Sequence, residues 1–307
     1  MAIIVTAAVL LAVLLIATQK RVGREEFSVA FDAEFLSRPD GYPGLKEAYG
    51  LEFKRPPMQM DPGLMYRALA EGTVNLIDGF ATDGRIKAYK LFVLEDDREF
   101  FPPYYAAPLV RRETLEKHPE LEDILNSLAG KISDSIMQQL NYQVDEKGKK
   151  AGEVAEEFLL SENLIGEAPE AGTKSGSIRI GGKHFTEQEI LGEIMSILIE
   201  RNTNIGVERR LNLGGTIICF NALRTGDIDI YAEYTGTGLV NILKHGVITE
   251  PESAYRKVRE EFEKEYGLIW LEPFGFNNTY TLTMREREAR KMGIRSISGL
   301  AEFLNAR

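Results

Sequence analysis

The amino-acid sequence predicts an α/β protein built from two similar lobes. Between residues 27 and 307, segments rich in β-branched and aromatic residues alternate with helical segments, which is typical of α/β units with parallel strands. An internal repeat indicates the second lobe: residues 68–84 (ALAEGTVNLIDGFATDG) align without gaps with residues 222–238 (ALRTGDIDIYAEYTGTG). Two units of ordinary domain size also fit a chain of 307 residues.

The first segment is strongly hydrophobic. Residues 2–18 (AIIVTAAVLLAVLLIAT) carry no charge and approach the shortest length that crosses a bilayer, and Lys20 and Arg21 follow. We expect residues 1–22 to form an N-terminal hydrophobic helix that anchors the chain in a membrane; a cleaved signal peptide and a buried core helix are the alternatives. The positive charges lie on the wrong side for an exported domain, unless the run is the last span of a longer membrane protein.

The first half of the remaining chain gives regular elements in a clear order. Apolar runs bounded by turn residues predict strands, and apolar stripes at helical spacing predict helices. We expect strands at 27–31, 51–55, 74–80 and 91–96. We expect helices at 44–49, 62–71 and 112–129, the last interrupted at Pro119, and two more helices between residues 131 and 160.

A linker separates this half from the next. Residues 166–176 (GEAPEAGTKSG) are small, polar and without periodicity. Beyond them the same criteria predict strands at 177–182, 207–213, 228–234 and 279–285, and helices at 186–201, 216–224 and 252–266. The predicted organisation is therefore a lobe at 23–165, a linker at 166–177 and a lobe at 178–307.

Composition excludes several classes of protein. The net charge is −10 and neither half carries a basic stripe, which argues against a nucleic-acid partner. A single cysteine and three histidines make a disulfide impossible within the chain and a zinc site improbable. The sequence contains no glycine-rich phosphate-binding motif, so we expect neither a metal nor a cofactor. We interpret the acidic pairs Glu95–Asp97 and Asp32/Glu34 as solvated loops rather than catalytic acids.

The repeat also indicates where a ligand would bind. Phe80 and Tyr234 occupy the carboxyl ends of the two equivalent strands. Open parallel sheets bind ligands at that edge, so two lobes with an aromatic residue there predict a ligand held between them. The alternative is that both rings belong to the core.

Several long motifs resemble one known family. The segments GGKHFTEQEILGEI, LNLGGT, YAEYTGTGL and FGFNNTYTL, from residues 181 to 282, resemble the first half of glycine betaine/choline-type ABC transporter substrate-binding proteins. The segments FDAEFLSRPDGYPGL, MDPGLMYRAL, GFATDGRIKAY and LEDDREFFPPYYAAPLVR, from residues 31 to 111, resemble the second half. The resemblance implies a two-lobed periplasmic binding protein fold, type II-like, whose cleft closes on quaternary ammonium solutes.

The two halves stand in permuted order relative to that family. One explanation is a circular permutation in which residues 166–176 join the old termini. The other explanation is a fragment of a tandem or fused transporter protein, whose halves belong to successive binding domains. The sequence leaves both open.

Matching the motifs position by position implies a set of ligand-binding residues. An aromatic cage for the ammonium group would consist of Phe80, Tyr104, Tyr234 and Tyr280. The position of Phe80 is commonly tyrosine in the family. A ligand carboxylate would be bound by Lys183, Arg38 and Thr237.

The resemblance implies a non-catalytic function. We expect the substrate-binding component of an osmoprotectant ABC transporter, binding glycine betaine, choline or a related quaternary ammonium compound and meeting an ABC permease and ATPase. Its location would be periplasmic or extracytoplasmic, either membrane-anchored or exported. The alternatives are a membrane-tethered quaternary ammonium sensor, a fragment of a tandem protein, and an enzyme on the same architecture.

Overall fold

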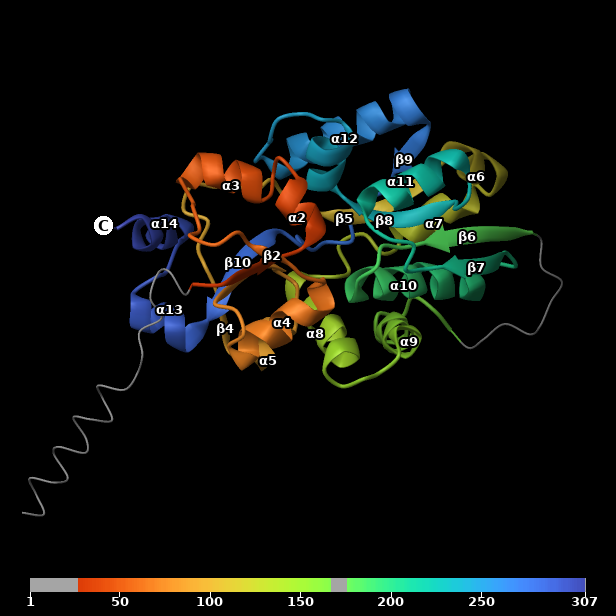
Figure 1. The fold of residues 1–307 in the computed structure, drawn as a ribbon. Coiled ribbons are helices and arrows are strands. Elements are labelled where there is room, and N and C mark those ends of the chain that lie inside the picture. Colours follow the sequence, from red (N-terminus) through yellow and green to blue (C-terminus); the bar gives the residue numbers. More distant parts are fainter. Residues whose placement is uncertain (1–26, 167–175, 307) are drawn as a thin grey trace, which may run out of the picture.

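Two five-stranded sheets organise the protein, one in each of two lobes (Figure 1). The computed structural model describes residues 27–166 and 176–306. The hydrophobic run at 2–18 and most of the linker lie outside the described residues. Within the described ranges, no helix combines the length and the apolar character that crossing a membrane requires.

The two sheets have the same topology, so that each strand of the first sheet has a counterpart at the same place in the second. The first sheet consists, in spatial order, of β2 (Met58–Gln59), β1 (Val29–Phe31), β3 (Leu76–Phe80), β10 (Tyr280–Arg285) and β4 (Leu91–Val93). The second consists of β7 (Gly206–Arg210), β6 (Ser177–Gly181), β8 (Ile230–Tyr234), β5 (Ala106–Arg111) and β9 (Leu268–Trp270).

Helices cover both sheets. The helices of the first lobe are α2 (Ala33–Ser37), α3 (Tyr42–Tyr49), α4 (Pro62–Glu71), α5 (Arg85–Ala88), α13 (Glu286–Met292) and α14 (Ile297–Asn305). The second lobe contains α6 (Arg112–Lys117), α7 (Glu120–Asn126), α8 (Asp134–Asp145), α9 (Ala151–Ser161), α10 (Thr186–Asn202), α11 (Thr216–Thr225), the π-helix η2 (Thr237–Ile242) and α12 (Pro251–Tyr266).

The sequence repeat corresponds to a structural repeat. Its two copies form α4–β3 and α11–β8, and β3 and β8 hold the same central position in their sheets. Each helix ends at a glycine in the left-handed conformation, Gly72 with φ of 85° and Gly226 with φ of 81°. Glycine adopts this conformation without the steric cost of a Cβ, which accounts for its place in both copies. The predicted α/β class with two lobes is confirmed.

Two predictions about strands were wrong. Residues 51–55 form no strand, although Leu51, which lies in this irregular segment, is buried. The strand that pairs with β1 is instead β2, which follows Pro56 and Pro57. The sheets are also not wholly parallel, because β10 runs antiparallel to β3 and β5 runs antiparallel to β8.

Because of these two antiparallel strands, the lobes do not correspond to the expected ranges 23–165 and 178–307. β10 follows the linker but lies between β3 and β4, whereas β5 precedes the linker but lies between β8 and β9. Helices α6 to α9 also precede the linker and lie in the second lobe, where α7, α8 and α9 pack against α10. Each lobe is therefore built from both halves of the sequence, because the chain crosses between the sheets twice.

The two crossings lie side by side. The backbone N–H of Tyr104 donates to Oδ1 of Asn277 at 2.7 Å, and the N–H of Asn278 donates to the carbonyl of Tyr104 at 3.1 Å. The first crossing leads into β5 and the second into β10. This paired connection places Tyr104 and Tyr280 at the interface between the lobes.

Candidate ligand-binding site

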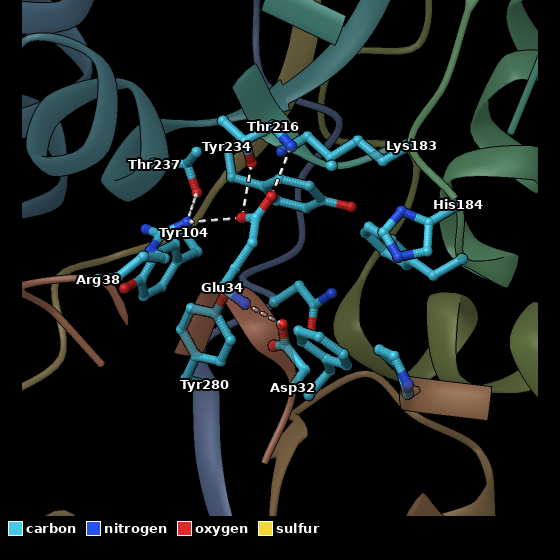
Figure 2. A pocket seen from close by; sticks show the side chains of 15 residues that line it. Asp32, Glu34, Arg38, Tyr104, Lys183, His184, Thr216, Tyr234, Thr237 and Tyr280 are labelled. Atoms are coloured by element: carbon cyan, nitrogen blue, oxygen red, sulfur yellow. Dashed lines mark hydrogen bonds and ion pairs between the residues drawn. The ribbon is translucent and has the colours of Figure 1, made fainter. Parts of the chain in front are cut away.

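A cavity of about 60 Å³ lies between the lobes and is lined by residues of both (Figure 2). The seven residues predicted from the sequence all line it: Arg38, Phe80, Tyr104, Lys183, Tyr234, Thr237 and Tyr280. They are brought together from segments on both sides of the linker. Other lining residues that the sequence analysis did not assign to the site include Asp32, Glu34, His184, Phe185 and Thr216.

Five aromatic rings form a continuous wall of this cavity. The ring centroids of Tyr104 and Tyr280 lie 5.4 Å apart, and those of Tyr280 and Phe80 lie 5.5 Å apart. Phe80 stacks on Phe185 at 5.6 Å, and Phe185 stacks on Tyr234 at 6.3 Å. The wall therefore runs from the first lobe into the second. Phe185 was missed, although it lies in the KHFTEQ motif two residues after Lys183.

Hydrogen bonds fix two of the tyrosine rings. The hydroxyl of Tyr104 donates to Oδ2 of Asp40 at 2.6 Å, and the hydroxyl of Tyr234 donates to Oε1 of Glu187 at 2.8 Å. Burial raises the pKa of Tyr104, Tyr234 and Tyr280 well above the usual value of a phenol. The rings consequently remain neutral at physiological pH and present uncharged π-faces.

The two predicted cations are buried and already paired with acids of the protein. Arg38 donates from Nε and Nη2 to the carboxylate of Asp40 at 2.8 and 2.6 Å, and from Nη1 to Oγ1 of Thr237 at 3.1 Å. Lys183 donates from Nζ to Oε1 of Glu233 at 2.6 Å. A ligand carboxylate would therefore share these cations with existing partners, which lowers what each contact adds.

Both cations also lie near rings of the aromatic wall. The guanidinium carbon of Arg38 is 5.3 Å from the centroid of Tyr280, and Nζ of Lys183 is 5.1 Å from the centroid of Tyr234. These distances are within the range of cation–π attraction. The rings of Tyr280 and Tyr234, which would receive a cationic ligand, therefore already interact with a positively charged side chain of the protein.

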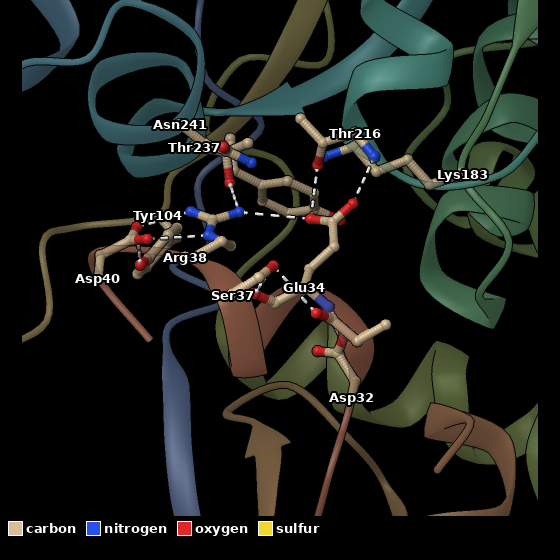
Figure 3. Close-up of polar contacts among 12 residues, drawn as sticks. Asp32, Glu34, Ser37, Arg38, Asp40, Tyr104, Lys183, Thr216, Thr237 and Asn241 are labelled. Atoms are coloured by element: carbon tan, nitrogen blue, oxygen red, sulfur yellow. Dashed lines mark hydrogen bonds and ion pairs between the residues drawn. The ribbon is translucent and has the colours of Figure 1, made fainter. Parts of the chain in front are cut away.

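The interpretation of Asp32 and Glu34 as a solvated loop was wrong (Figure 3). Asp32 is buried, and its Oδ1 accepts a hydrogen bond from the N–H of Glu34 at 2.6 Å at the start of α2. Glu34 reaches across the cavity to Thr216, where Oε1 accepts from the backbone N–H at 2.6 Å and Oε2 from the hydroxyl at 2.9 Å. Burial alone would raise the pKa of Glu34, but the charge of Lys183 and the Thr216 donors lower it below its usual value.

A second carboxylate crosses the interface in the opposite direction. Glu187, at the start of α10 in the second lobe, accepts hydrogen bonds from Thr82 in the first lobe and from Tyr234. Asn141 and Asn278 donate to the same carboxylate at 3.1 and 2.8 Å. Burial raises the pKa of Glu187 in spite of these four donors. The sequence analysis missed Glu187, because nothing local indicates that a helix-start acid is buried by another lobe.

The arrangement defines a class of protein: two α/β lobes with an aromatic, internally charge-paired cavity between them are typical of a solute-binding receptor. Residues 17–161 and 176–306 match the family described as the substrate binding domain of ABC-type glycine betaine transport systems. The chain belongs to this family.

Individual relatives match only part of their length. The carnitine transport binding protein OpuCC of Listeria monocytogenes is 46% identical over 142 residues, which are 46% of this chain and 46% of the relative. A glycine-betaine-binding protein of Pseudomonas aeruginosa is 40% identical over 148 residues, 47% of this chain and 48% of the relative. An ergothioneine transport permease/binding protein of Helicobacter pylori is 40% identical over 135 residues, 44% of this chain and 24% of the relative.

The same partial coverage is found among solved structures. A crystal structure of a glycine betaine/carnitine/choline ABC transporter protein is 42% identical over 46% of this chain and 51% of the other, with a TM-score of 0.36. This chain thus spans about half the length of the curated relatives and of the similar structure that it matches.

Proposed function

We propose that this chain is a non-catalytic receptor that binds a quaternary ammonium compound between its lobes and presents it to an ABC permease and its ATPase. The single observation that carries the proposal is the wall of five aromatic rings, contributed by both lobes to one cavity. The names of the relatives, which refer to glycine betaine, carnitine and ergothioneine, agree with a small organic ligand that carries a positive nitrogen centre.

The chemistry of the wall suits such a ligand. A quaternary ammonium group has no proton to donate, so hydrogen-bond acceptors hold it poorly. Neutral aromatic faces attract it through their quadrupoles, at about 0.5–2 kcal/mol for each face. We propose that Phe80, Tyr104, Tyr234 and Tyr280 supply these faces, and the stacking of Phe185 between Phe80 and Tyr234 supports adding it to them.

A ligand carboxylate is proposed to lie towards Arg38, Lys183 and Thr237. Their existing pairing with protein groups supports a modest contribution, so a ligand without a carboxylate, such as choline, would lose little at this end. We therefore propose glycine betaine and choline as the ligands to test first.

We also propose that the chain is a circular permutant rather than a fragment of a tandem protein. Two features of the sheets support this. β10 fills the position between β3 and β4, and β5 fills the position between β8 and β9, so strands from both sides of the linker complete each sheet of the same chain. A single chain would then form its own cleft.

The proposed location is extracytoplasmic, where binding components of ABC importers meet their solutes. We propose that residues 2–18 attach the chain to the membrane, on the basis of their uncharged apolar sequence. Membrane fractionation of the full chain, followed by carbonate washing, tests this. Release of the protein by carbonate would contradict it.

The function is tested by titrating the purified full chain in detergent with glycine betaine and choline in a calorimeter. We expect saturable one-to-one binding by a monomer, with the ligand recovered chemically unchanged. Tyr104→Ala and Tyr234→Ala should each weaken binding by about 2- to 30-fold. Tyr266→Ala, which removes a half-buried tyrosine that packs within the second lobe and outside the cavity, is the control.

Three outcomes would contradict the proposal. A folded monomer that binds neither ligand would exclude the receptor function for these compounds. Near-normal affinity in both cavity variants would exclude the aromatic cage. Conversion of the ligand would show an enzyme instead.

A further inference from the structure

We infer that Glu34 is a latch residue, whose carboxylate stabilises the closed arrangement of the lobes by binding the N-terminus of α11 across the cleft (Figure 3). Glu34 belongs to α2 of the first lobe, whereas Thr216 begins α11 of the second, 182 positions further along the chain. The inference rests on the proposed function only for the ligands used to test it.

The contact uses both carboxylate oxygens and completes the helix. α11 begins after Gly215, which offers no side-chain cap, so the first N–H groups of the helix lack a local acceptor. Glu34 supplies that acceptor from the other lobe, at 2.6 Å from the N–H and 2.9 Å from the hydroxyl of Thr216. Because these groups belong to different lobes, the contact stabilises only states in which the lobes are together.

The surroundings keep Glu34 ionised. Its carboxylate lies 3.5 Å from Nη1 of Arg38, and Lys183 lowers its pKa although burial opposes this. A charged acceptor at the positive end of a helix dipole gives a stronger bond than a neutral one. Glu34 is therefore a more effective link between the lobes than an ordinary polar contact.

The space at the start of α11 is matched to Glu34. A Cβ placed on Gly215 would lie 2.4 Å from Oε1 of Glu34 and would force that side chain away. The φ and ψ of Gly215, −81° and −175°, are extended values that alanine adopts without strain. Gly215→Ala should consequently displace the latch while every charge in the cavity remains.

The base of the latch is held by the core of the first lobe. Asp32 caps α2 by accepting from the N–H of Glu34, and the N–H of Asp32 in turn donates to Oδ1 of the fully buried Asp78 at 2.9 Å. Asp78 lies in the central strand β3. The orientation of Glu34 is thus set by the sheet of its own lobe, so that closure brings it onto Thr216.

The test compares two latch variants of the full chain, Glu34→Ala and Gly215→Ala, with matched controls. Glu71→Ala removes an exposed acid from the same lobe, and Gly152→Ala adds a methyl group to α9 with no neighbour closer than 3.7 Å. Calorimetry gives the affinities for glycine betaine and choline. Pulsed electron spin resonance gives the distance between the lobes without ligand, from labels on cysteines introduced at the exposed Lys46 and Lys264.

Both latch variants should lower the affinities for glycine betaine and for choline by the same factor, about tenfold, because the contact between Glu34 and Thr216 stabilises closure of the lobes and does not involve the ligand. They should also lengthen the interlobe distance without ligand, and saturating ligand should restore it. The controls should leave affinities and distance unchanged.

Unchanged affinities together with an unchanged distance in both variants would overturn the inference. So would the loss of affinity for only one ligand, since Glu34 would then contact the ligand itself. If the unsubstituted chain binds neither ligand, the proposed function fails, but the distance without ligand still tests the latch. If Glu34→Ala does not fold, the affinities and the interlobe distance of Gly215→Ala test the inference.

Discussion

The proposed cage makes its sharpest prediction at Tyr280, which lies at the centre of the ring cluster. Its centroid is 5.0 Å from Phe35, 5.5 Å from Phe80, 5.4 Å from Tyr104 and 6.3 Å from Phe101. Tyr280→Phe keeps the ring and its face, whereas Tyr280→Ala removes both. The pair of variants therefore separates the aromatic face from the hydroxyl.

The expected magnitudes follow from this environment. Loss of one aromatic face should cost about 0.5–2 kcal/mol of binding free energy, or about 2- to 30-fold in affinity. Truncation of a buried aromatic ring to alanine should also lower the free energy of unfolding by about 3–5 kcal/mol. Tyr280→Phe removes no part of the ring, so its affinity should stay close to that of the unsubstituted chain.

The assay is calorimetric titration with glycine betaine and choline, at a temperature where denaturation curves show each variant to be folded. The reasoning would be refuted if Tyr280→Phe lost as much affinity as Tyr280→Ala, because the hydroxyl would then carry the interaction. Unchanged affinity in Tyr280→Ala would equally show that the ring does not contact the ligand.

Two further predictions concern buried acids. Asp40→Asn should lower the free energy of unfolding by about 3–5 kcal/mol, because it removes the carboxylate that accepts hydrogen bonds from the buried Arg38 and from Tyr104, and leaves Arg38 only the more distant carboxylate of Glu34 at 3.5 Å. Urea denaturation measures this, and a loss below 1 kcal/mol, well under that estimate, would contradict it. Burial and the charge of Asp32 raise the pKa of Asp78 well above 3.8, so the native state binds a proton that the unfolded state releases. The free energy of unfolding should therefore fall as pH rises from 3.8 through the native pKa, and Asp78→Asn should flatten this dependence in a pH series of denaturation curves. A slope unchanged by the substitution would assign the proton to another group.

Local pattern was enough to predict much of the fold. The helices expected at 62–71 and 186–201 correspond to α4 and α10, because apolar periodicity is a property of neighbouring residues. The repeat located β3 and β8 for the same reason. The strand β5 was missed because Pro108 lies within it and proline normally argues against a central strand. Only its pairing between β8 and β9 shows that it completes the second sheet.

The site divides in the same way. The sequence by itself, through its resemblance to a family, indicated seven side chains that meet in one cavity. It did not indicate Glu34 and Glu187, whose partners Thr216 and Thr82 lie 182 and 105 positions away. Short-range pattern determines which segments are helices, strands and turns. Whether an acid faces water or closes a contact between lobes is decided only by packing across the chain, since burial and the distance to a distant donor do not exist before the fold does.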